Sequence, residues 1–172
     1  MIDVLGGNDD WKGSQAPVMY SHSSAYAICP HPRNVKDHVL EMVKARNSVV
    51  LVNIAGDFIA CKDVGADNGI PVPVPEEATL GRVVEHIMHI GDLIGYDHVG
   101  VGTDFDGIRA TPKDLDDVTG YPDVVAELLK RGVSDEDAGK VVGGNILRVW
   151  KDVEDVAAKM QAEGAPVLED DI

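Results

Sequence analysis

Three short apolar runs that alternate with helical patterns constrain the fold of this chain most. The runs cover residues 16–21, 48–55 and 98–103, and turn-forming residues bound each of them, as is typical of buried parallel strands. Between the runs, apolar residues recur at helical spacing over residues 35–46 and 77–95. This order predicts an α/β fold in which right-handed crossovers join parallel strands and helices lie outside the sheet.

Further helices are expected after the third strand, over residues 123–131 and about 135–160. Ser134 resembles the start of a capping box, and Gly143 with Gly144 should break or bend the second helix. The Gly- and Pro-rich residues 62–76 suit an extended surface loop, and the acidic residues 164–172 form a tail. With 172 residues and no repeat, the chain fits one domain.

Charge and hydropathy exclude several partners. Thirty acidic residues face fifteen basic ones, and the resulting net charge of -15 disfavours nucleic acid and anionic membranes as partners. No apolar run approaches the roughly 20 residues of a membrane helix, and the N-terminus lacks the features of a signal peptide. We therefore expect a soluble chain without a membrane segment, whose location is otherwise undetermined.

Polar side chains follow the predicted strands at their carboxyl ends, where parallel α/β folds bind ligands. His22 follows the first strand, Asn53 the second, and Asp104 the third. From the residues alone, His22 and Asp104 fit a structural role as well as a functional one, whereas Asp106 beside Gly107 favours a role in holding the turn.

Other patterns carry little functional signal. Glu85, His86 and His89 lack the i, i+4 histidine spacing of a helical zinc site, which favours structural roles for them. No GxGxxG, P-loop or GxSxG sequence occurs, so dinucleotide, nucleoside triphosphate and serine-hydrolase chemistry lack support.

Four segments carry a family resemblance: APVMYSHSSAYAICPHPRNV from residue 16, HVGVGTDFDG from residue 98, DLDDVTGYPDVVAELLKRG from residue 114 and GGNILRVW from residue 143. In this order and spacing they resemble the renal (membrane) dipeptidase family of zinc metallopeptidases. The resemblance implies a (β/α)8 TIM barrel that hydrolyses dipeptides at a centre of two Zn²⁺ ions. It assigns His22 as a ligand of one zinc. It also assigns Arg33 to the substrate carboxylate, and Asp104 to the substrate amino end and to proton transfer.

The chain also departs from the family pattern. The HxD pair, the bridging glutamate and the D-L-x-H segment are absent, although residues 1–4 resemble the start of the strand that ends in D-L-x-H, with Gly6 in place of its histidine. Phe58 stands where some relatives have a substrate-contacting tyrosine. We therefore expect residues 1–163 to be the C-terminal part of a barrel, with its last three strands and an exposed strand edge through which copies could associate.

The resemblance further implies that Cys29 pairs with Cys61, as in secreted relatives, whereas a reducing compartment would keep them as thiols. The leading hypothesis is a zinc-dependent dipeptidase whose activity this chain alone does not support. Two alternatives stay open. One is a non-catalytic remnant or regulatory paralogue that acts by protein interaction, and the other is a metal-dependent hydrolase of another small amide.

Overall fold

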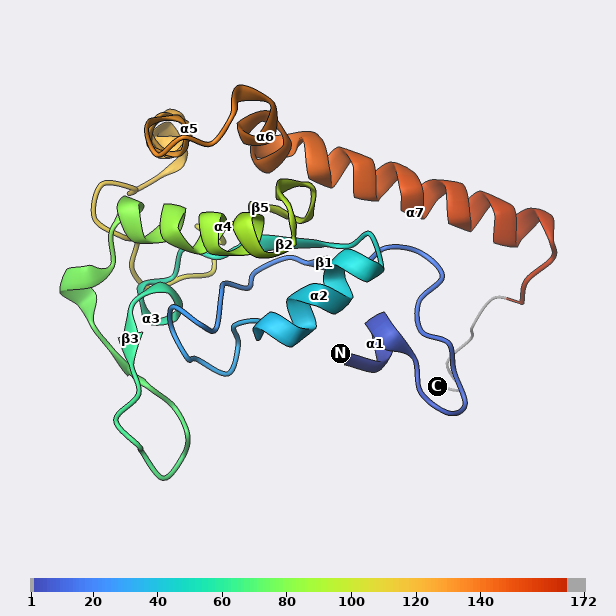
Figure 1. The fold of residues 1–172 in the computed structure, drawn as a ribbon, viewed down its shortest axis with the longest axis horizontal. Coiled ribbons are helices and arrows are strands. Elements are labelled where there is room, and N and C mark those ends of the chain that lie inside the picture. The colour runs from blue at the N-terminus through green and yellow to red at the C-terminus, as the bar shows by residue number, and fades with distance from the viewer. Residues whose placement is uncertain (1, 167–172) are drawn as a thin grey trace.

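The computed structural model describes residues 2–166 and contains a parallel sheet of three strands (Figure 1). The strands are β1 (Met19–Tyr20), β2 (Val49–Val52) and β5 (Val99–Val101), in the order β1-β2-β5. Met19 lies opposite Val49, and Val50 lies opposite Val99. All three predicted strands are present and parallel, although each is shorter than its apolar run.

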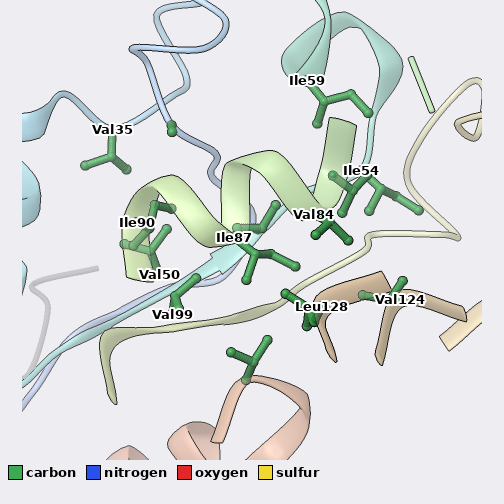
Figure 2. Packing of buried hydrophobic residues seen from close by; sticks show 14 of the residues in the cluster. Val35, Val50, Ile54, Ile59, Val84, Ile87, Ile90, Val99, Val124 and Leu128 are labelled. Carbon is green, nitrogen blue, oxygen red and sulfur yellow. The ribbon is translucent and has the colours of Figure 1, made fainter. Parts of the chain in front are cut away.

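Helices α2 (Asp37–Ala45) and α4 (Leu80–Ile94) connect these strands, as the helical periodicity predicts. The side chain of Thr79 accepts a hydrogen bond from the backbone N–H of Arg82 and so caps the start of α4. Gly95 follows its end with φ of 97°, a conformation that favours glycine. Ile87 and Ile90 of α4 belong to the same core cluster as Val50 and Val99 of the sheet (Figure 2).

The C-terminal helical region is divided as predicted at its glycine pair. Helix α5 (Tyr121–Lys130) precedes α6 (Asp135–Gly139), a π-helical turn (Lys140–Gly144) and the long α7 (Asn145–Ala162). The helical backbone is interrupted at Gly143, and Ser134 accepts a hydrogen bond from the backbone N–H of Asp137 at the start of α6. The predicted acidic tail lies mostly outside the described residues, since 167–172 are not among them.

Strand β2 is buried on both faces of the sheet. Val50 and Val52 belong to the main core with α2 and α4, whereas Val49 and Leu51 pack with Val149 of α7. Because successive side chains of a strand point to opposite faces, α7 covers the face that α2 and α4 leave open. Within residues 2–166, β1 pairs with β2 alone, so its other edge has no strand partner.

Two segments differ from expectation. Residues 2–6 form the short helix α1 (Ile2–Gly6) and not a strand, because buried Leu5 packs inward and Arg46 binds its carbonyl oxygen. The predicted extended loop contains an antiparallel pair, β3 (Cys61–Lys62) with β4 (Val72–Pro73), and the 3-10 turn η1 (Pro75–Glu77). The remaining short elements are α3 (Gly56–Ile59), η2 (Tyr96–His98) and η3 (Val118–Gly120).

Candidate functional site

His22 lies in the loop after β1 and is tied to the end of β5. Its Nδ1 is 3.1 Å from the carbonyl oxygen of Gly102. A carbonyl can only accept a hydrogen bond, so Nδ1 carries the proton and the lone pair of Nε2 stays available. Metal-ligating histidines are commonly oriented by a bond of this kind.

Arg33 lies at the far end of the same loop, with an exposed side chain that stacks on Phe58 of α3. Its guanidinium carbon is 5.0 Å from the centre of the Phe58 ring, and the ring of His31 lies 4.5 Å from the same centre. Burial and the positive charge of Arg33 lower the pKa of His31, while the carboxylate of Asp57 partly opposes this. Among residues 2–166, Arg33 is therefore held by an aromatic face and not by an acidic partner.

The loop that carries Arg33 is fastened to β3 by a disulfide and to α3 by one buried amide. Cys29 and Cys61 are disulfide-bonded, with their Cα atoms 5.1 Å apart, which is within the range that such a bond requires. The side-chain N–H groups of Asn34 donate to the carbonyl oxygens of Cys29 and Phe58, at 2.9 and 2.7 Å. These contacts fix the backbone on either side of Arg33.

Asp104 follows β5 in an unusual backbone conformation, with φ of 63°. Its carbonyl oxygen accepts hydrogen bonds from the backbone N–H groups of Gly107 and Ile108, at 2.9 and 3.1 Å. A Cβ atom on residue 107 would collide with the carboxylate of Asp104. Any residue other than glycine at this position would therefore displace that carboxylate. Left-handed conformations of non-glycine residues are uncommon and occur often at functional sites.

Arg33 and Asp104 line one cleft of about 400 Å³. Asp57 and Phe58 lie on the wall that carries Arg33, and Arg109 belongs to the segment after Asp104. The structure thus brings together Arg33 and Asp104, two of the three residues to which the family resemblance assigns a role. His22 is at the same end of the sheet, as its bond to Gly102 shows, but it does not line this cleft.

The comparisons with known proteins identify the family. A model of the membrane dipeptidase family (peptidase family M19) matches residues 1–164. The chain belongs to this family. Dipeptidase aclJ of Aspergillus oryzae, a family relative, is 49% identical over 159 residues, which are 92% of this chain and 35% of that protein. The chain therefore spans about a third of the length of this relative.

Two solved structures of metallopeptidases have a fold similar to that of this chain. The dipeptidase AC is 31% identical, with a TM-score of 0.68 over 81% of this chain and 38% of that one. A metallopeptidase from Rhodobacter sphaeroides, liganded with a phosphinate mimic of the dipeptide L-Ala-D-Ala, is also 31% identical, with a TM-score of 0.65 over 81% of this chain and 37% of that one. The α/β fold of this chain is thus one that metallopeptidases of the membrane dipeptidase family share.

The donor set for a metal of this family is incomplete in residues 2–166. No group of three or more His, Cys, Asp or Glu side chains in this range is arranged to hold a metal ion, although a tight zinc site needs three or four protein ligands. The described residues therefore do not fit a zinc centre by themselves. No helix within the same range is both long and apolar enough to span a membrane.

Sequence reasoning misses Asn34 as a residue that positions the site, although it directly follows Arg33. It names His86 as structural but does not give its partners. His86 accepts a hydrogen bond from the N–H of Ala25 and contacts the carbonyl of Ile59 at 2.9 Å. Its neighbour His89 pairs with Asp37 at 3.0 Å. The signal for His86 is a polar residue within an apolar helical stripe, and the sequence offers no comparable signal for Asn34.

Proposed function

We propose that this cleft binds the dipeptide substrate of a zinc-dependent dipeptidase. Arg33 would bind the terminal carboxylate and Asp104 the amino end. The observation that carries the proposal is that a guanidinium and a carboxylate, delivered by loops after different strands, line one cleft. The family and the dipeptidase relative support a dipeptide over another small amide.

Each residue has a chemistry suited to its part. The planar guanidinium of Arg33 can donate two parallel hydrogen bonds to a carboxylate, and the ring of Phe58 keeps it in place. The carboxylate of Asp104 can accept N–H hydrogen bonds from the substrate ammonium group. A carboxylate in reach of the scissile amide could also accept a proton from the attacking water and then pass it to the leaving amine.

We further propose that His22 supplies one ligand, through Nε2, to a zinc ion whose remaining ligands lie outside the described residues. Zinc would lower the pKa of a bound water and polarise the scissile carbonyl. The three parallel strands would then be part of a larger (β/α)8 barrel. This chain supplies the substrate-binding side of such a centre and does not catalyse hydrolysis by itself.

Titration of the ¹⁵N-labelled chain with Ala-Ala tests the proposal, because NMR detects weak binding without turnover. We expect shifts confined to signals from the cleft. Arg33→Gln and Asp104→Asn should each weaken binding about tenfold, as expected for loss of one charge-assisted hydrogen bond. Matched controls are Lys159→Gln and Asp155→Asn on α7, which should bind like the wild type. Equal binding by wild type and cleft variants would refute the assignment.

A further inference from the structure

The arginines of this chain separate into two groups according to their partners. The chain has six, all within residues 2–166. Four are used by the fold, since their guanidinium groups donate to carboxylates or backbone carbonyls: Arg46, Arg82, Arg131 and Arg148. The guanidinium groups of Arg33 and Arg109 donate no hydrogen bond and form no ion pair with any residue in that range.

Both of these arginines line the same cleft. Arg109 is exposed and follows Asp104 in the segment after β5, whereas Arg33 is stacked on Phe58. Asp57 is the second acidic residue of the cleft. Its negative charge raises the pKa of His31, which lies beside Arg33, and it forms no ion pair with Arg109. A simple dipeptide has one ammonium and one carboxylate, which Asp104 and Arg33 suffice to bind. Arg109 then has no ionic partner in such a dipeptide or among residues 2–166.

We infer that Arg109 determines specificity, by binding a second carboxylate on the substrate. The inference rests on the proposed function, and it defines the substrate class as dipeptides with an acidic side chain. A bound dipeptide excludes water from the guanidinium, which is unfavourable unless an acceptor replaces that water. An acidic side chain supplies this acceptor through charge-assisted hydrogen bonds, whereas a neutral isostere supplies a weaker one.

The negative charge of the chain restricts where an anionic substrate can bind. At a net charge of -15, the surface as a whole repels a doubly anionic ligand. Preference for such a ligand therefore requires positive groups that no acidic residue neutralises. Within residues 2–166, the cleft gathers the two arginines that meet this condition.

The test compares isosteric pairs, Ala-Asp with Ala-Asn and Asp-Ala with Asn-Ala, by NMR titration of the full chain at low salt. We expect the acidic member of at least one pair to bind about tenfold tighter, as one charge-assisted contact predicts. The pair that shows the preference tells which substrate residue faces Arg109. Arg109→Gln should remove the preference, and Arg109→Lys should retain part of it.

Lys113→Gln is the matched control, because Lys113 is exposed in the same segment but does not line the cleft. It should keep the full preference. If dipeptides bind and require Arg33, but no acidic preference exists or Arg109→Gln leaves it unchanged, this inference is wrong and the proposed function stands. If no dipeptide shifts the cleft signals, the proposed function fails and this inference fails with it.

Discussion

The cleft and the surroundings of His22 differ in how completely this chain builds them. In the cleft, charged groups from three segments face one space, and a disulfide, Asn34 and a stacked ring hold its wall. Around His22, one imidazole is oriented by one carbonyl, and residues 2–166 provide no cluster of further ligands. The proposed substrate binding and the proposed metal binding are therefore separable, and each can be tested without the other.

The largest expected effect comes from the disulfide that fastens the cleft wall. Replacing Cys29 and Cys61 together by alanine opens a loop of 32 residues. In the chain-entropy model this lowers the free energy of unfolding by roughly 3 to 4 kcal/mol. Urea unfolding of the oxidised wild type and of the double variant measures this decrease in the free energy of unfolding. Reducing agent should destabilise the wild type and leave the variant unaffected, and a loss well below 1 kcal/mol would contradict the prediction.

The next effect concerns His86, which joins the loop after β1 to the end of α3. Burial lowers the pKa of His86 from 6.5 to about 4 in the folded chain. Between these two pH values the unfolded chain binds the proton of His86 more readily than the folded chain does. The free energy of unfolding is therefore undiminished by His86 above pH 6.5 and falls as the pH drops toward 4. The total change is up to about 3 kcal/mol.

Urea unfolding of the wild type and His86→Gln at pH 7, 5.5 and 4.5 isolates this contribution, because other acidic groups titrate equally in both proteins. The stability difference between the two should shrink as the pH falls. A difference that is constant with pH would show that His86 is not the group responsible.

A smaller effect is expected at Phe58, whose ring supports Arg33. Phe58→Leu removes the aromatic face and should weaken Ala-Ala binding two- to fivefold, the size of an exposed cation–π contact of about 0.5 to 1 kcal/mol. Phe58→Tyr keeps the ring and should bind like the wild type. The same NMR titration measures both variants. Equal weakening by leucine and tyrosine would mean that the ring itself does not position Arg33.

Local patterns in the sequence predicted the fold better than they predicted the site. The strands, their parallel order, the cap at Ser134 and the break at Gly143 depend on neighbouring residues, and the structure agrees with them. The contact of Asn34 with Phe58 and that of His86 with Ala25 were not predictable, because these partners lie 24 and 61 residues away in sequence and meet only after folding.

Family resemblance supplied what local patterns could not. It named Arg33 and Asp104, which share a cleft in the structure. It did not indicate that His22 lies outside the lining of that cleft, since this depends on how the loop after β1 turns toward Gly102. It also gave no reason to single out Arg109. This residue stands out only in the structure, because its guanidinium group has no hydrogen-bond or ion-pair partner among residues 2–166.

The most direct test of the account is zinc calorimetry on the purified chain, with hydrolysis of Ala-Ala followed in the same preparation under excess zinc. One imidazole cannot hold zinc tightly, because such a site needs three or four protein ligands. We therefore expect no stoichiometric submicromolar zinc binding and no chelator-sensitive hydrolysis. Stoichiometric submicromolar binding together with chelator-sensitive turnover would contradict this expectation, and would show that this chain contains a complete metal centre.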